Sequence, residues 1–295
     1  MKILLTGKNG QVGFELQRAL APLGEVTALD REACDLLDAD AVRALVSRIA
    51  PDVIVNPAAY TAVDKAESDK DTAFAINAQA LGVLGEEAAR TGALVIHYST
   101  DYVFDGLKTS AYSESDLPAP QSVYGSSKLA GERALAASNP RHLILRTSWV
   151  VGAHGGNFAK TMLRLAAERE QLSVVADQFG APTSAALLAD LTAHLVRQYQ
   201  REDKQSFPYG TYHLAASGET NWCDYARFVL AQALAAGKQL KAGPEQVLPL
   251  RTEQYPTPAK RPANSRLDTS RFRETFGLRL PPWEEGVRHM LAQIL

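Results

Sequence analysis

The first half of the chain alternates short β-branched runs with longer segments of helical periodicity. The β-branched runs are residues 2–6, 25–29, 52–56, 93–99 and 142–147, and the helical segments are residues 11–20, 39–49, 72–91 and 122–137. Strands separated by helices of this length are joined by right-handed crossovers, which build a parallel sheet. The sequence therefore predicts an α/β fold with a doubly wound parallel sheet of the Rossmann type.

The second half has a looser rhythm. Its expected helices are 157–168, 186–198 and 221–236, its strands are 172–175 and 210–215, and its loops are 177–183, an exposed polar stretch at 200–209 and a turn-rich, three-proline segment at 255–262. We expect residues 1–150 to form the dinucleotide-binding domain. Residues 151–295 are expected to form mainly a smaller, discontinuous α/β substrate-binding lobe, with residues 184–216 or so returning to the Rossmann core.

Composition excludes several functional classes. The chain has 295 residues and a formal net charge of −2, and its cations are not clustered, so we expect no nucleic-acid partner. No apolar run approaches the roughly 20 residues that span a bilayer, so we expect no membrane partner and a cytoplasmic location. Cys34 and Cys223 are far apart and the histidines are scattered, so no catalytic metal is expected. His97 lies inside a predicted strand, where we expect it to bond to a neighbouring residue.

Three glycines, Gly7, Gly10 and Gly13, follow the first strand and open the first helix. In this context glycines let backbone N–H groups approach a pyrophosphate. The spacing is GxxGxxG rather than GxGxxG, so the strand and the helix beside it support the interpretation more than the spacing does. The expected cofactor contacts are Gly7, Asn9, Gly10, Gln11, Val12, Gly13, Asp30, Arg31, Asp35, Leu36, Ala58, Ala59, Tyr60, Tyr124 and Lys128.

The end of the second strand bears on which nicotinamide cofactor is used. Asp30 lies where a carboxylate binds the adenosine ribose hydroxyls, which favours NADH. Lys8 and Arg31 are expected beside Asp30. Either cation could neutralise a 2′-phosphate, or it could be a solvated surface charge. We therefore predict that NADPH or NADH is used. Residues 34–36 are expected to cover the adenine, and residues 56–61 to line the nicotinamide side.

A tyrosine and a lysine four residues apart, Tyr124 and Lys128, share one face of a predicted helix. An ammonium near a phenol, together with the positive nicotinamide ring of the oxidised cofactor, lowers the pKa of the phenol, so we expect Tyr124 to act as a general acid toward a carbonyl oxygen. Thr100, at the end of the fourth strand, is placed to hydrogen-bond the same oxygen. A Tyr-x-x-x-Lys match alone could arise by chance on an exposed helix, but the glycine loop and Thr100 favour reductase chemistry.

Longer motifs carry a resemblance to a known family. They are residues 7–16, 61–67, 97–104, 124–132, 146–150, 157–163, 178–183 and 261–267. Through them, nearly the whole chain resembles the extended short-chain dehydrogenase/reductase superfamily and, within it, the dTDP-4-dehydrorhamnose reductases. The last four segments lie outside the general superfamily pattern, so they make the resemblance specific.

The resemblance implies reduction of the C4 ketone of dTDP-4-dehydro-6-deoxy-L-mannose to dTDP-L-rhamnose, a step in nucleotide-sugar and cell-surface polysaccharide biosynthesis. It implies that Thr100, Tyr124 and Lys128 are catalytic. An aromatic ring suits the apolar side of a sugar and an arginine suits a pyrophosphate, although Trp149 could be a buried anchor and Arg261 a surface ion pair. The implied substrate contacts are Thr61, Val63, Thr100, Asp101, Tyr102, Trp149, Asn157, Arg261 and Asn264.

The resemblance also leaves alternatives. Some members form dimers bridged by Mg²⁺ and glutamates. Glu15 is present, but residues 185–190 and 292–295 lack glutamate, so we expect a monomer or weak homodimer, with an Mg²⁺ bridge as the less favoured alternative. A sibling dehydratase would need a second acid directly after Asp101, where Tyr102 stands. The remaining alternatives are another dTDP-4-keto-6-deoxysugar reductase or epimerase, and a non-catalytic, cofactor-binding regulatory subunit similar to that of methionine adenosyltransferase.

Overall fold

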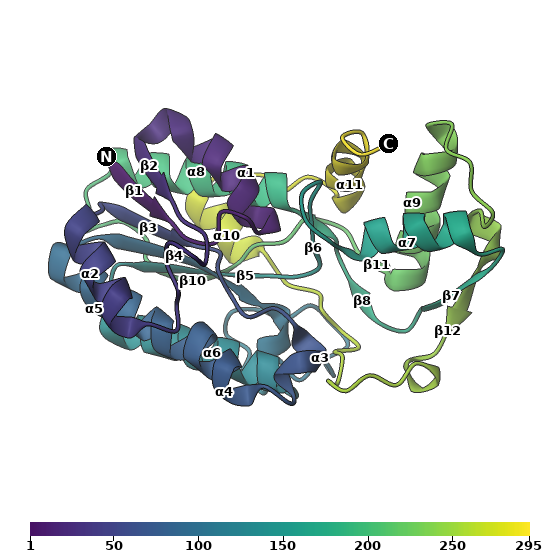
Figure 1. The fold of residues 1–295 in the computed structure, drawn as a ribbon, viewed down its shortest axis with the longest axis horizontal. Coiled ribbons are helices and arrows are strands. Elements are labelled where there is room, and N and C mark those ends of the chain that lie inside the picture. Colours follow the sequence, from purple (N-terminus) through teal and green to yellow (C-terminus); the bar gives the residue numbers. More distant parts are fainter.

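The structure, a computed structural model, describes residues 1–295 and has a larger and a smaller lobe (Figure 1). The larger lobe is built on one six-stranded sheet in which every neighbouring pair is parallel. Across the sheet the strands are β10 (Gly210–His213), β5 (His142–Thr147), β4 (Leu94–Thr100), β3 (Val53–Asn56), β1 (Lys2–Leu5) and β2 (Glu25–Ala28). This order confirms the predicted doubly wound α/β fold, and the chain reverses its direction of winding between β1 and β3.

Helices cover both faces of this sheet because successive strand residues point to opposite sides. In β1, Ile3 and Leu5 join one buried cluster and Leu4 joins another. On the first face lie α1 (Gln11–Leu20), α8 (Ala185–Arg201) and α10 (Ser270–Phe276), and on the other lie α2 (Ala39–Ile49), α5 (Ala80–Thr91) and α6 (Val123–Ser138) (Figure 1).

The helix predicted at residues 72–91 is interrupted. The structure has α3 (Val63–Ala66), α4 (Lys70–Phe74), a π-helical turn (Ala75–Gln79) and then α5. Asn77 in this turn accepts from the Tyr60 backbone N–H at 2.8 Å, and its Nδ2 donates to the Tyr60 carbonyl at 3.1 Å and to Ser127 Oγ at 2.9 Å. The turn thus joins the loop after β3 to α6, which is a common use of single π-helical turns near functional sites.

The smaller lobe combines short strand pairs with three helices. Its strand pairs are β6 (Val150–Val151) with β9 (Thr183–Ser184), β7 (Leu172–Val175) with β12 (Val247–Leu250), and β8 (Phe179–Gly180) with β11 (Thr220–Asn221). Its helices are α7 (Phe158–Glu168), α9 (Trp222–Ala235) and α11 (Trp283–Leu291). Single 3₁₀ turns lie at Ala21–Leu23, Asp101–Val103, Pro244–Gln246 and Thr252–Gln254.

Several details differ from the sequence prediction. The stretch 200–209 is not wholly exposed, because α8 continues to Arg201 and Phe207, which is only 3% exposed, packs into the core beside Tyr199. Strand β10 ends at His213 rather than at residue 215, and it lies beside β5 in the large sheet. Helices α10 and α11 near the C-terminus were not predicted. The assignment of separate roles to the two lobes stays a prediction.

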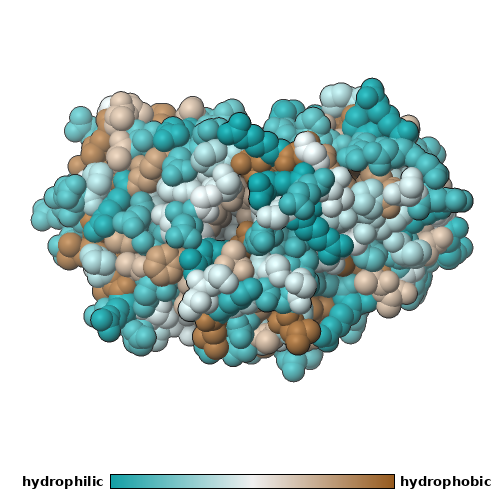
Figure 2. All heavy atoms as spheres, turned by 180° about the vertical axis from the view of Figure 1, so that it is seen from behind, coloured by the Kyte–Doolittle hydropathy of each residue, from teal (hydrophilic) through white to brown (hydrophobic).

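The surface offers no broad apolar face in the view of Figure 2, where hydrophobic residues are scattered among hydrophilic ones. None of the helices combines the length and the apolar content that crossing a bilayer requires.

Two glycines inside helices test the contact between the π-helical turn and α6. A Cβ on Gly131 in α6 would lie 2.0 Å from the Asn77 carbonyl oxygen, whereas one on Gly82 in α5 would meet Ala134 Cβ at 3.5 Å. Alanine favours helices by about 1 kcal/mol relative to glycine. We expect Gly82→Ala to be neutral or stabilising, and Gly131→Ala to lower the free energy of unfolding by about 1–3 kcal/mol in chemical denaturation. Equal stability of the two variants would contradict this close contact.

Candidate active site

A cavity of about 830 Å³ lies where the carboxyl ends of the large sheet meet the smaller lobe. It is lined by both the glycine loop and the Tyr124 helix, so the structure brings the two predicted motifs together. Of all the predicted site residues, only Asn157 and Asn264 are absent from its lining. The predicted residues that line it are Gly7, Asn9, Gly10, Gln11, Val12, Gly13, Asp30, Arg31, Asp35, Leu36, Ala58, Ala59, Tyr60, Thr61, Val63, Thr100, Asp101, Tyr102, Tyr124, Lys128, Trp149 and Arg261.

The glycine loop has the shape that a bound dinucleotide needs. Gly7 has φ +60°, a left-handed conformation that favours glycine, and the Gly10 N–H donates to the Gly7 carbonyl at 3.0 Å. A Cβ on Gly13 would lie 2.0 Å from the same carbonyl oxygen. Helix α1 begins at Gln11 with no side-chain cap, so its first N–H groups face the cavity end of the loop. The loop therefore fits a pyrophosphate.

Charged residues at the end of β2 form the adenosine side of the cavity. Lys8 Nζ lies 3.0 Å from Asp30 Oδ2, and this hydrogen bond lowers the pKa of the Asp30 carboxyl. Arg31 is mostly exposed and lies 4.0 Å from Asp35. The arrangement offers a carboxylate for ribose hydroxyls and two cations for a 2′-phosphate, so it suits either cofactor.

Thr100 ends β4, and Tyr124 and Lys128 occupy the first two turns of α6. The expected lowering of the pKa of Tyr124 is wrong for this structure: burial raises it, the nearby Asp101 carboxylate adds to the rise, and a hydrogen bond with Thr100 opposes it. The sequence argument counted the nearby charge of Lys128 but not the removal of the phenol from water. The phenol is therefore held in its neutral, proton-donating form.

Lys128 is buried, with 1% of its surface exposed. Its Nζ donates to the Tyr98 carbonyl oxygen at 2.7 Å and lies 2.9 Å from His97 Nε2. Burial lowers the pKa of Lys128 to about 7, while the charge of Glu132 opposes the change. The amine is thus held on the β4 side of the cavity and can gain or lose its proton near neutral pH.

Several buried polar atoms in the cavity lack a partner in the protein. Thr100 Oγ1 donates to Asp101 Oδ1 at 3.0 Å, but Asp101 Oδ2 has no partner, and burial raises the pKa of this carboxyl to about 6. Buried polar groups without partners are rare in proteins and often mark a place for a ligand. The sequence analysis did not identify three of these residues, Ser99, Thr147 and Ser148, although they lie at the ends of β4 and β5. It also did not identify Trp222, a second tryptophan in the cavity lining.

Trp149 and Arg261 lie on the smaller-lobe side of the cavity. Trp149 has φ +48°, and its ring stacks on Trp222 with centroids 3.7 Å apart. Arg261 Nη2 lies 2.6 Å from Asp64 Oδ2, and its Nη1 donates to the Tyr102 hydroxyl at 3.1 Å. The ring and the guanidinium are therefore both held by neighbouring side chains at the edge of the cavity.

Asn157, predicted to bind substrate, instead joins the two lobes. Its Oδ1 accepts from the Lys160 N–H at the start of α7, and its Nδ2 donates to Gln11 Oε1 at 3.0 Å and to the Gly152 carbonyl at 2.7 Å. These bonds use both amide hydrogens and one acceptor site of Oδ1. Asn157 does not line the cavity, and its contact with substrate stays a prediction.

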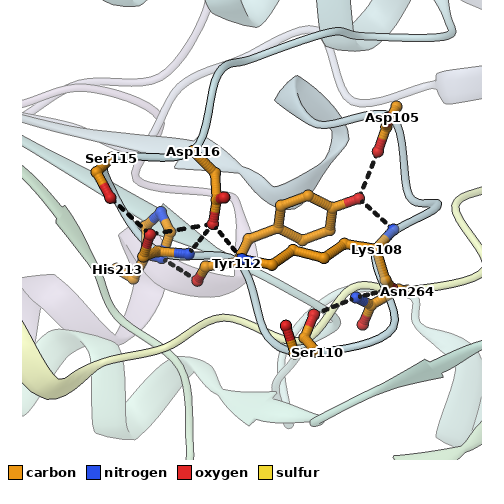
Figure 3. A network of polar contacts seen from close by, with 9 residues as sticks. Asp105, Lys108, Ser110, Tyr112, Ser115, Asp116, His213 and Asn264 are labelled. Carbon is orange, nitrogen blue, oxygen red and sulfur yellow. Dashed lines mark hydrogen bonds and ion pairs between the residues drawn. The ribbon is translucent and has the colours of Figure 1, made fainter.

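Asn264 is 4% exposed and, like Asn157, lies outside the cavity lining. Its Nδ2 donates to the carbonyl oxygens of Lys108 and Ser110, as Figure 3 shows. The same loop is closed by an ion pair between Lys108 and Asp116 at 2.6 Å. Asn264 therefore anchors the segment that carries Arg261, and its contact with substrate stays a prediction.

Glu15, the residue considered for a magnesium bridge, lies close to Asp190 at the α1–α8 contact. Arg18 Nη2 lies 3.6 Å from Glu15 and 3.0 Å from Asp190, so an arginine already serves as their counterion. No group of three or more His, Cys, Asp or Glu side chains in the structure is arranged to hold a metal ion.

Comparisons with known proteins identify the same family, and each covers all or nearly all of this chain. The family model described as RmlD substrate binding domain matches residues 1–295. The dTDP-4-dehydrorhamnose reductases of Shigella flexneri and Escherichia coli strain K12 are each 52% identical over 298 residues, covering 100% of this chain and 98% of theirs. A crystal structure of dTDP-4-dehydrorhamnose reductase from Bacillus anthracis in complex with NADP is 36% identical and superposes with a TM-score of 0.89, with 99% of each chain covered.

The buried amine predicts a pH-dependent stability. Because the folded protein releases the Lys128 proton near pH 7 and the unfolded chain near 10.5, the unfolded chain binds more protons between these values, and stability rises with pH across them. Lys128→Met removes this dependence. We compare the free energies of unfolding of the variant and the native protein, both without cofactor. We expect the value for Lys128→Met minus the value for the native protein to be larger at pH 7 than at pH 10 by a few kcal/mol.

The exposed Lys65→Met serves as the control and should show no such difference between the two pH values. An equal effect of Lys128→Met at pH 7 and pH 10 would show that the amine keeps its ordinary pKa.

Proposed function

The chain belongs to the RmlD substrate binding domain family, and from this premise we propose that it reduces the C4 ketone of dTDP-4-dehydro-6-deoxy-L-mannose to dTDP-L-rhamnose, using NADPH or NADH. One observation carries the proposal: the glycine cradle and the Thr100–Tyr124 pair line the same cavity. The curated relatives with about half of their residues identical support the choice of substrate.

A bound reduced nicotinamide supplies a hydride to the ketone carbon. The protein must then stabilise and protonate the ketone oxygen. The neutral Tyr124 hydroxyl donates the proton. The Thr100 hydroxyl beside it turns its hydrogen from Asp101 Oδ1 to the same ketone oxygen and fixes the direction of that oxygen. Protonated Lys128, one helical turn further along α6, stabilises the phenolate that forms.

The rest of the cavity suits a nucleotide sugar. The stacked Trp149 offers an aromatic face to the apolar side of the sugar, and the unpartnered Ser148 and Asp101 oxygens can bond its hydroxyls. Arg261 can bind the pyrophosphate, in exchange for part of its contact with Asp64. On this proposal residues 1–150 bind mainly the cofactor and the smaller lobe binds mainly the substrate.

The proposal extends to the setting of the reaction. We place the enzyme in the cytoplasm, where reduced nicotinamide cofactors are available, with a small-molecule dTDP-sugar as its partner and no nucleic acid. We propose a monomer or weak homodimer, a state that the Glu15–Arg18–Asp190 cluster allows without a metal. The product would enter cell-surface polysaccharide biosynthesis.

The reaction can be tested with the substrate made in place. The protein is incubated with dTDP-glucose, the upstream dehydratase and epimerase, and either NADPH or NADH. We expect dTDP-L-rhamnose, identified by mass and NMR, with one reduced cofactor consumed per product. An epimerase would consume none because it regenerates its cofactor, and a regulatory subunit would give no product.

Removal of one hydroxyl tests the proton donor. We expect Tyr124→Phe to lower kcat by about 10²–10⁴-fold, the usual contribution of a general acid, while NADPH still binds. The matched control is Tyr199→Phe, because the buried Tyr199 hydroxyl has no partner and packs in α8. Turnover by Tyr124→Phe close to that of the control would exclude Tyr124 as the acid.

A further inference from the structure

His97 stands out as a buried polar side chain that lies beneath the cavity without lining it. It is 1% exposed in the middle of β4, where the neighbouring strand residues are apolar. Its Nε2 lies 2.9 Å from Lys128 Nζ. Burying a polar ring here is unfavourable unless its nitrogens are hydrogen-bonded, so the contacts that it makes are informative.

The contacts of the ring define its tautomer. Nδ1 lies 3.1 Å both from the Asn56 carbonyl oxygen, which can only accept, and from Asn56 Nδ2, which can only donate, so these two contacts fit either tautomer. The contact at Nε2 decides, because protonated Lys128 has no lone pair and Nε2 must accept from it. Nδ1 then carries the ring proton and donates it to the Asn56 carbonyl oxygen. Burial and the charge of Lys128 both lower the pKa of His97, which keeps the ring neutral and able to accept.

The position of the ring is fixed by the sheet. Asn56 and His97 are register partners in the pairing of β3 with β4, so their side chains lie next to each other. Asn56 Oδ1 accepts in turn from Thr6 Oγ1 at 2.5 Å. A line of hydrogen bonds therefore runs from the residue after β1 through β3 and β4 to the amine on α6.

Lys128 has few other acceptors. An ammonium has three hydrogens, and the Tyr98 carbonyl and His97 take two of them, which leaves one for the cavity. Glu132 lies one turn further along α6, but both its oxygens are bound by Arg146 at 2.9 and 2.6 Å. The ionisable groups that act on Lys128 are His97 on β4, which contacts its amine, and Glu132 on α6, whose charge raises its pKa, while Tyr124 and Asp101 line the same cavity.

We propose that His97 is a positioning residue for the proposed reduction: its neutral Nε2 accepts one hydrogen of the Lys128 ammonium and so directs the remaining hydrogen into the cavity, toward Tyr124 and the cofactor. This role rests on the proposed function. The imidazole does not itself touch the reacting atoms, and its hydrogen-bond line ends at buried Thr6, so it orients the amine and does not conduct protons to solvent.

Two amide substitutions separate the two ends of the ring. In His97→Gln, the longer side chain places an amide oxygen near the position of Nε2 and keeps an acceptor for Lys128. In His97→Asn, the shorter amide reaches only the position of Nδ1 and keeps the contact with Asn56. The two variants are similar in polarity, so a general penalty for replacing the ring should affect both.

We expect His97→Asn to lower kcat by about 10–100-fold with little change in KM for the sugar nucleotide, because a misdirected catalytic group costs rate more than binding. The fall of kcat on the alkaline side of the pH profile should begin at a lower pH in His97→Asn, because an ammonium that has lost an acceptor gives up its proton more easily. His97→Gln should stay near the native rate and pH profile. Thermal unfolding and NADPH binding report whether each variant is folded.

A second readout needs no turnover. In cofactor-free protein labelled with ¹³C-lysine, the Lys128 Cε resonance is assigned by its absence in Lys128→Met and titrated. We expect a lower titration midpoint in His97→Asn than in the native protein and in His97→Gln. The role of His97 would be overturned by an unshifted titration midpoint in His97→Asn. It would also be overturned by equal losses of kcat in His97→Asn and His97→Gln with unchanged pH profiles. A native protein that leaves the dTDP-4-keto sugar unreduced would instead overturn the proposed function.

Discussion

The burial of one ammonium group is the constraint on which the rest of the site depends. Lys128 is almost fully removed from water, so the structure must supply acceptors for it, and they come from β4 as the Tyr98 carbonyl and His97. Meeting this requirement fixes the distance and rotation of α6 against β4. Because Tyr124 lies one turn earlier on the same helix, its hydroxyl is placed in the cavity beside Thr100 by the same contacts.

The parallel sheet is what makes this arrangement possible. All six strands end at one edge, so residues distant in sequence, such as Gly7 and Thr100, line one cavity. The helices that follow these strands are then tied to one another by side chains. Asn77, in the π-helical turn, bonds both the loop after β3 and Ser127 on α6, so the cofactor side of the cavity and the proton-donating helix are held together as one unit.

Local patterns were enough to predict much of this. Strand and helix periodicity gave the sheet, and the glycine loop and the Tyr-x-x-x-Lys pair lie in the cavity where they were expected. Local patterns did not reveal the contacts of residues whose partners are distant. Asn264 binds carbonyl groups 156 and 154 residues away, and Asn77 binds Ser127 50 residues away, and no local pattern encodes such pairs. The direction of the shift in the pKa of Tyr124 failed for a related reason, because burial is a property of the whole fold.

The two ends of the cavity differ in how they meet a ligand. At the β2 end, Lys8, Asp30 and Arg31 are partly or mostly exposed and are paired with one another or with neighbours, so water can replace any contact that a ligand does not make. At the β4–β5 end, buried atoms of Asp101 and Ser148 have no partner, and such groups are satisfied only by a ligand or water of the right geometry. Discrimination should therefore be strict at the end where the chemistry occurs and permissive at the adenosine end. This asymmetry is consistent with the proposed function, in which a particular sugar ketone is reduced with either NADPH or NADH.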